Sequence, residues 1–282
     1  MVKINQTGFN YLSDTAFGPM IYNKNDLYIG RSLELYGEYS FGEYALFSQI
    51  VTPEMVVVEI GANIGSLTVG LAQLANQGRV YAFEPQRIVF QTLCANITLN
   101  NLSNVFAYQY AVGAESGTIK VPDLDPYIEN NFGGIELGPE VHGNSVPLTT
   151  IDQMNFQQLD FLKMDIEGME CEALKGATET IRRFRPIIYV EADRQERFTE
   201  LYTILSGHRY RMYWSLVNLY RPDNFRGVTE DVFQIFSANL LCIPEERDIT
   251  VTDMPPVTGP DDSWQAAIGR ANYCAVQPPS IA

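Results

Sequence analysis

One short segment of the chain has residue types and a spacing that suit ligand binding. Its pattern is Glu59-x-Gly61-x-x-x-Gly65, and it separates an apolar β-branched run from a helical pattern. Glycine permits positive φ and close approach of the backbone to a ligand. The first N–H groups of a helix can hold a carboxylate, here with help from Ser66. A pyrophosphate-binding fingerprint has glycine at the position of Asn63, so the spacing disfavours NAD.

A second candidate, Glu84, ends the next apolar run, about 20 residues after the glycines. A carboxylate at this position is placed to accept hydrogen bonds from both hydroxyls of a ribose. Pro85 then ends the strand. The alternative is a charge favoured by the dipole of the following helix. Together with the glycine segment, ribose binding is the better interpretation.

The third candidate group is acidic and follows two later apolar runs. Asp165 and Glu167 come where the first of these runs ends, and Glu191 ends the second. We expect these carboxylates to lie over the same pocket, although capping of the next helix by Asp165 is the alternative. The three could also assemble an oxygen site for a metal. No ligand spacing demands one, and we expect no metal.

These residues need a sheet whose strands end side by side. From residue 55 onward, apolar runs alternate with helical patterns, which indicates a parallel α/β sheet with right-handed crossovers. Ligands of such sheets bind beyond the carboxyl ends of the strands. The predicted fold is a Rossmann-like, seven-stranded, mostly parallel sheet with helices on both faces. We expect strands at 55–60, 79–83, 105–112, 161–165, 186–191, 210–214 and 240–243, with helices at 64–74, 88–99, 174–184 and 197–205.

Three regions follow from this pattern. Residues 1–50 form an N-terminal α/β lid or cap, with a hairpin pairing 20–22 with 27–30 and a helix at 41–50. Residues 51–245 form the main domain. Within it, the segment 113–150 interrupts the alternation with a hairpin at 118–121 and a mobile loop around 130–134, long enough to be a functional lid. Residues 246–282 form an irregular tail.

Composition narrows the choice of partners. The 282 residues carry a formal net charge of −15, which would repel a phosphate backbone, so we expect no nucleic-acid partner. Four cysteines without a C-x-x-C pair, and only two histidines, make a Cys/His zinc site improbable. The cysteine spacing also indicates a reducing, cytoplasmic location. We see no signal peptide and no apolar stretch long enough for a membrane span.

The motifs described above, taken together, resemble those of a known enzyme family. The chain resembles the FkbM family of class I S-adenosylmethionine (SAM)-dependent methyltransferases over roughly residues 35–195. The discriminating part is the D-x-E-G-x-E signature that begins at Asp165. Further similarity lies at 112–113, 149–152 and 37–46. The resemblance rests chiefly on the segments Glu59-Ile60-Gly61-Ala62-Asn63-Ile64-Gly65, Phe83-Glu84-Pro85 and Lys163-Met164-Asp165-Ile166-Glu167-Gly168-Met169-Glu170.

The resemblance implies a SAM cofactor, with S-adenosylhomocysteine as product, and specific residues around it. Glu84 would hold the ribose, and Ala111 and Val112 would flank the adenine. Many class I enzymes have an acidic residue near this last turn, so backbone groups would replace it here. The residues around the methionine moiety would be Glu59, Gly61, Asn63 and Ser66, and Ala62, Gly65, Pro85 and Asp165 complete the cofactor-binding set.

The implied reaction is O-methylation of a hydroxyl or carboxylate on a sugar, polyketide, lipid or peptide. Methyl transfer requires the acceptor oxygen to be placed in line with the breaking C–S bond. A neutral hydroxyl also needs a base, for which Asp165 and Glu167 are the first candidates, followed by Glu191 and His208. A carboxylate acceptor needs none. The expected partner is a small-molecule or peptide acceptor, with no membrane involved and a possible homodimer.

Two other function classes stay open. One is a nucleotide-sugar or NAD-dependent enzyme on a similar sheet, against which the glycine spacing weighs. The other is a catalytically inactive SAM-fold binding module. The residues of the glycine segment and Glu84 argue for cofactor binding, but they do not report turnover.

Overall fold

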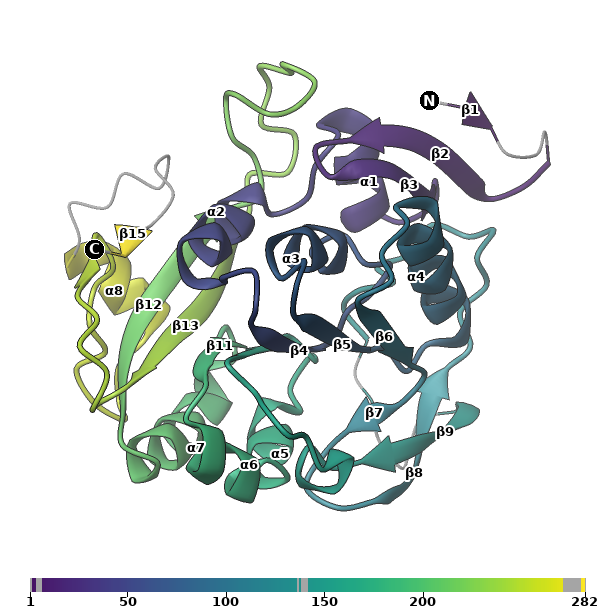
Figure 1. The fold of residues 1–282 in the computed structure, drawn as a ribbon. Helices are drawn as coiled ribbons and strands as arrows, with labels where there is room; N and C mark the ends of the chain where they lie inside the picture. Colours follow the sequence, from purple (N-terminus) through teal and green to yellow (C-terminus); the bar gives the residue numbers. More distant parts are fainter. Residues whose placement is uncertain (1, 4–6, 136, 138–141, 271–279, 282) are drawn as a thin grey trace.

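A central sheet of seven strands organises the molecule (Figure 1). The computed structural model describes residues 2–3, 7–135, 137, 142–270 and 280–281. β13 is antiparallel to both of its neighbours, whereas the other pairs are parallel. The predicted Rossmann-like α/β fold is therefore confirmed. The strand order is β12 (Tyr210–Asn218), β13 (Phe236–Pro244), β11 (Ile187–Glu191), β10 (Phe161–Met164), β4 (Val56–Ile60), β5 (Arg79–Phe83) and β6 (Val105–Tyr108).

Helices cover both faces of this sheet (Figure 1). The central strands are apolar throughout because successive side chains point to opposite faces and both faces are buried. Val57 packs in one core cluster with Phe47, and its neighbour Val58 packs in another with Leu174. One face carries α2 (Phe41–Ile50), α3 (Thr68–Leu74) and α4 (Arg87–Leu99), and the other carries α5 (Glu170–Lys175), α6 (Thr178–Phe184) and α7 (Gln195–Gly207).

The N-terminal hairpin differs from the prediction. The observed sheet joins β1 (Val2–Lys3), β2 (Asn10–Thr15) and β3 (Gly18–Asn23), and the segment predicted as the second hairpin strand instead leads into α1 (Ile29–Leu35). The reason is Asp26, whose carboxylate accepts hydrogen bonds from the N–H groups of Tyr28 (3.2 Å) and Gly30 (3.1 Å). These bonds stabilise a turn into a helix where a second strand was expected.

The strand predicted at 105–112 is divided. β6 ends at Tyr108, and β7 (Ala111–Val112) leaves the central sheet to pair with β9 (Gly143–Thr149). β9 also pairs with β8 (Gly117–Pro122), so the hairpin expected near 118–121 has its second strand in a segment predicted as loop. This small sheet, followed by η1 (Asp152–Met154), lies beside the main one (Figure 1).

Two further differences concern helices. The helix predicted at 174–184 is two helices, α5 and α6, because the chain at Gly176 packs against the backbone of residue 113. A Cβ at Gly176 would lie 2.1 Å from the Gly113 carbonyl oxygen. The segment 246–282, expected to be irregular, contains β14 (Val251–Thr252), α8 (Trp264–Arg270) and β15 (Ser280–Ile281). The division into three regions stays a prediction.

Among the described residues, every helix is too short or too polar to cross a membrane.

Candidate functional site

A cavity of about 370 Å³ opens where strands β4, β5, β10 and β11 end. The chain runs from β4 to β5 and β6 on one side and returns to β10 and β11 on the other, so this is the point where the strand order reverses. In open α/β sheets ligands bind at this position, and the volume lies in the range of small-molecule sites. The lining contains Gly61, Ala62, Asn63, Ser66, Pro85 and six acidic side chains: Glu43, Glu59, Glu84, Asp165, Glu167 and Glu191.

The turn after β4 brings the glycine segment against β10. Gly61 has φ +82°, and a Cβ there would lie 1.8 Å from the Asp165 carbonyl oxygen, so only glycine fits. Asn63 (φ +50°) and Gly65 (φ +87°) continue the left-handed turn. The backbone thus folds tightly around the end of β4 and presents its residues to the cavity.

Glu84 is held by the backbone of two segments. The N–H groups of Asn63 (3.0 Å) and Gln86 (2.8 Å) donate to its two carboxylate oxygens. Burial raises the pKa of Glu84 to about 7, although these two hydrogen bonds oppose the shift. The carboxylate is therefore fixed in orientation at the end of β5, and its remaining lone pairs are available to hydroxyl donors.

A buried lysine, Lys163, lies between the carboxylate of Glu59 in β4 and that of Asp165 after β10. Lys163 Nζ lies 3.7 Å from Glu59 Oε1 and 3.6 Å from Asp165 Oδ2. The Thr68 hydroxyl donates to Glu59 Oε2 at 2.6 Å. Burial raises the pKa of Glu59 to about 6, against the lowering effect of Lys163. Burial alone would lower the pKa of Lys163, but the neighbouring carboxylates raise it, so the lysine is a fixed cation in this site.

The three acidic candidates predicted as catalytic lie together at the ends of β10 and β11. Carboxylate oxygens of Asp165, Glu167 and Glu191 all lie within 4.8 Å of one another. Arg194 donates to Glu167 at 3.0 Å. Burial, followed by the charge of Asp165, raises the pKa of Glu167 to about 7, and the same two causes raise the pKa of Glu191 well above its usual value. The side chain of Asp165 is 39% exposed, compared with 25% for that of Glu167.

Other predicted residues lie elsewhere. Of the described candidates, Ala111, Val112 and Gly65 are outside the cavity lining. Ala111 and Val112 are buried where β7 pairs with β9, because the chain leaves the central sheet after β6. Their contact with adenine stays a prediction. His208 follows α7, and its carbonyl accepts a hydrogen bond from Arg185, away from the cavity.

Sequence reasoning missed several lining residues. Glu43, from α2, is buried and accepts hydrogen bonds from the Ser237 hydroxyl (2.7 Å) and the Asn239 side-chain amide (3.3 Å). Tyr39 and Lys163 also line the cavity without having been assigned a role. The single charged side chain in the helix at 41–50 was the available signal for Glu43. The loop predicted around 130–134 does border the cavity, through Asn131, Gly133 and Gly134.

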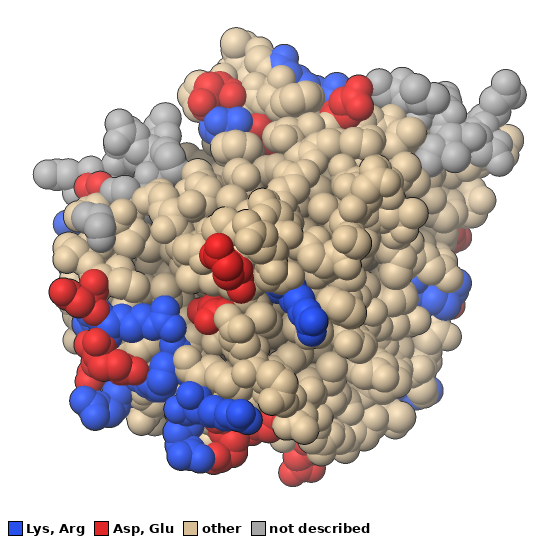
Figure 2. All heavy atoms as spheres, in the orientation of Figure 1, with Lys and Arg blue, Asp and Glu red and all other residues tan. Residues whose placement is uncertain are grey.

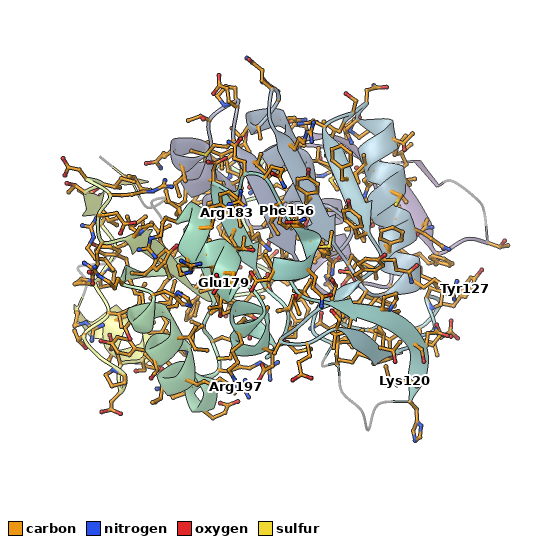
Figure 3. All side chains as sticks on the ribbon, turned by 60° about the horizontal axis from the view of Figure 1, so that its bottom comes forward. Lys120, Tyr127, Phe156, Glu179, Arg183 and Arg197 are labelled. Atoms are coloured by element: carbon orange, nitrogen blue, oxygen red, sulfur yellow. The ribbon has the colours of Figure 1, made fainter. Side chains whose placement is uncertain are left out.

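The charges outside the cavity are mixed. Figure 2 shows acidic and basic side chains interleaved on the part of the surface formed by α6 and α7. Lys175, at the end of α5, pairs with Glu200 of α7. A second hollow, about 330 Å³, is lined partly by Phe156, Glu179 and Arg183, which lie near one another in Figure 3. Of its two carboxylates, Asp152 accepts hydrogen bonds from two N–H groups in the first turn of α6 and so serves to cap that helix.

We expect the stability of the ligand-free protein to fall as pH rises from 5 to 8. The folded state binds the protons of Glu84 and Glu59 more tightly than the unfolded chain, whose glutamates titrate near 4.5. Stability from these groups is therefore fully present below about pH 4.5 and is lost as pH rises to about 7. Denaturant unfolding measures this loss. Between pH 5 and 8 the free energy of unfolding of Glu84→Gln should fall by about 1–3 kcal/mol less than that of wild type. Equal decreases would contradict the buried-acid explanation, and the exposed Glu54→Gln is the matched control.

The mostly parallel sheet with its antiparallel β13, the reversal in strand order and the glycine turn facing Glu84 are those of the class I methyltransferase fold. Residues 59–212, more than half of the chain, match the family described as the methyltransferase FkbM domain. The chain therefore belongs to this family, and the resemblance seen in its motifs is confirmed.

Two curated relatives are methyltransferases by name. Methyltransferase 1 of Beauveria bassiana is 26% identical over 142 residues, covering 43% of this chain and 57% of the relative. Methyltransferase sdnD of Sordaria araneosa is 29% identical over 157 residues, covering 44% and 60%. The chain thus spans less than two thirds of the length of these relatives. A solved FkbM methyltransferase from Methylobacillus flagellatus KT is 24% identical with a TM-score of 0.47, covering 70% of this chain and 48% of that one.

Proposed function

We propose that the protein transfers a methyl group from SAM to an oxygen of a small-molecule, sugar or peptide acceptor. Membership of the FkbM family supports the reaction class. The oxygen acceptor is the finer part of the proposal, and it follows from carboxylates lying where a hydroxyl would need a base.

The observation that carries the choice of cofactor is the charge of the cavity. Six acidic side chains and one lysine line it. SAM is a net cation, because its sulfonium and ammonium groups outnumber its carboxylate. A dinucleotide brings a doubly charged pyrophosphate, for which the described lining offers only Lys163 as a counter-charge and which every ionised carboxylate there would repel. The cavity therefore suits SAM better than NAD.

The residues would divide the work of binding and positioning. Glu84 would accept hydrogen bonds from the ribose hydroxyls, while the turn of Gly61, Ala62 and Asn63, together with Ser66, would contact the methionine moiety. When bound, SAM supplies an electrophilic methyl group. Asp165 and Glu167 would orient the acceptor and take the proton of its hydroxyl, and the loop bordering the cavity would limit entry of water.

Calorimetric titration tests the cofactor directly. We expect SAM and S-adenosylhomocysteine to bind the full chain with micromolar dissociation constants, and NAD not to bind. Folded protein that binds neither sulfur nucleoside would contradict the proposal. Binding without methyl transfer across a broad screen of acceptors would favour the inactive binding module.

We expect Glu84→Ala to weaken SAM binding by roughly ten- to a hundredfold. Hydrogen bonds to a charged group contribute about 1.5–3 kcal/mol, and the variant loses those to the ribose. The same titration measures the change, with circular dichroism to verify folding. The matched control is Glu54→Ala, an exposed glutamate outside the cavity. An unchanged dissociation constant for Glu84→Ala would place the ribose elsewhere.

A further inference from the structure

The register of two neighbouring strands places two carboxylates side by side. β10 and β11 pair in parallel with Met164 opposite Val190, so Asp165, just after the end of β10, and Glu191, the last residue of β11, lie side by side. Glu167 joins them from the following turn, in which it adopts φ +55° and Gly168 φ +96°. As a result, each residue offers a carboxylate oxygen within 4.8 Å of the others.

One oxygen in this group has no partner. Glu191 Oε2 is buried and makes no hydrogen bond to any described residue. The nearby cations are engaged with the other carboxylates: Lys163 lies 3.6 Å from Asp165, and Arg194 donates to Glu167. A buried carboxylate oxygen without a donor or counter-ion is costly. It therefore points to a ligand that the protein chain does not itself supply.

The chemistry of the three donors selects the kind of ligand. All are carboxylate oxygens, which are the preferred ligands of Mg²⁺, Mn²⁺ and Ca²⁺, whereas zinc sites favour sulfur and nitrogen donors. A small, doubly charged cation would satisfy Glu191 Oε2 and offset the mutual repulsion of three acids. A neutral hydrogen-bond donor would satisfy the oxygen but would not offset the repulsion, and an anionic ligand would do neither.

We propose that Asp165, Glu167 and Glu191 bind a divalent metal ion of the Mg²⁺ type in the cavity. This departs from the expectation, drawn from ligand spacing, that no metal is bound. The spacing along the chain is uninformative here because two ligands come from different strands. The part that the ion plays rests on the proposed function: beside the acceptor it would lower the pKa of the acceptor hydroxyl.

Binding of Mn²⁺, measured by electron paramagnetic resonance, tests the site without SAM or acceptor. After treatment with chelator, the full-length wild type should bind one Mn²⁺ ion, and Mg²⁺ should compete for it. Glu191→Gln should weaken this binding by about tenfold or more. The matched control is Glu196→Gln, the same change at an exposed position on α7, which should bind as wild type does.

Thermal unfolding provides a second test, in which the variant should be no less stable than wild type without metal but should not be stabilised by Mg²⁺. Millimolar Mg²⁺ should raise the melting temperature of wild type, because a ligand that binds only the folded state stabilises it. Glu191→Gln removes an unpartnered buried carboxyl group, so it should melt at or above the wild-type temperature without metal and should gain nothing from Mg²⁺. If this variant does not fold, Asp165→Asn, at a more open position, should likewise gain no melting temperature from Mg²⁺.

The possible outcomes separate this site from the cofactor proposal. Absence of Mn²⁺ binding to wild type, or equal affinity of wild type and Glu191→Gln, overturns the metal site even where SAM still binds. Mn²⁺ binding that depends on Glu191 supports the site, even if titration with SAM alone shows no binding and the proposed function fails.

Discussion

Asp165→Asn is expected to lower the rate of methyl transfer by about 10²–10⁴-fold, the range for loss of a general base. Asp165 is the open member of the acidic group and lies against the cavity at the end of β10. Asparagine keeps its size but can neither accept the proton of a hydroxyl nor carry charge. The affinity for SAM should change less than tenfold, because Glu84 and the glycine turn are untouched. Single-turnover assays with an acceptor found by screening measure the rate.

The control for this variant is Asp248→Asn, an exposed aspartate outside the cavity, which should react at the wild-type rate. A rate for Asp165→Asn within about twofold of wild type would show that no base is supplied here, as for a carboxylate acceptor. The two roles open to Asp165 are also separable. If Asp165 acts as a base, the lowered rate of Asp165→Asn is independent of the Mg²⁺ concentration. If Asp165 instead binds the ion, higher Mg²⁺ concentrations should partly restore the rate.

The central strands were predictable because both of their faces are buried. Runs such as Val56–Ile60 and Ile187–Glu191 are apolar at nearly every position, a pattern that few other structures share. β9 was missed for the opposite reason. Its residues are largely exposed and lie in a segment rich in glycine and proline, so the strand exists only through its pairing with β7 and β8. Pairing between distant segments leaves little trace in local sequence.

The residues of the candidate site likewise fall into those that the strand pattern predicts and those that only packing brings to the cavity. Glu59, Glu84 and Asp165 were predictable because they lie at or just beyond the carboxyl ends of strands that must end at one edge of the sheet. Glu43 was not, because it reaches the cavity only when α2 packs onto the sheet and its carboxylate meets Ser237 and Asn239 from β13. The unpartnered oxygen of Glu191 is likewise a property of packing, which no spacing along the chain encodes.

Gly61→Ala is expected to destabilise the protein by about 4 kcal/mol or more, a large share of the stability of a typical domain. Two costs combine. A residue with a side chain pays about 1–2 kcal/mol to adopt the left-handed conformation that Gly61 has at φ +82°. In addition, its Cβ would lie 1.8 Å from the Asp165 carbonyl oxygen, so the ends of β4 and β10 must separate. Chemical denaturation monitored by circular dichroism measures the loss.

Separation of these strand ends would also displace Glu59 of β4 from Lys163 of β10, so any folded fraction of Gly61→Ala should bind SAM poorly. Gly207→Ala is the matched control. Gly207 ends α7 with no atom within 4 Å of an added Cβ, and alanine there should be neutral or slightly stabilising. If Gly61→Ala unfolded at the same denaturant concentration as Gly207→Ala, the close approach of β4 to β10 could not be what requires glycine at this turn. The tight turn would then be dispensable for stability, and a defect confined to SAM binding would assign Gly61 to the cofactor alone.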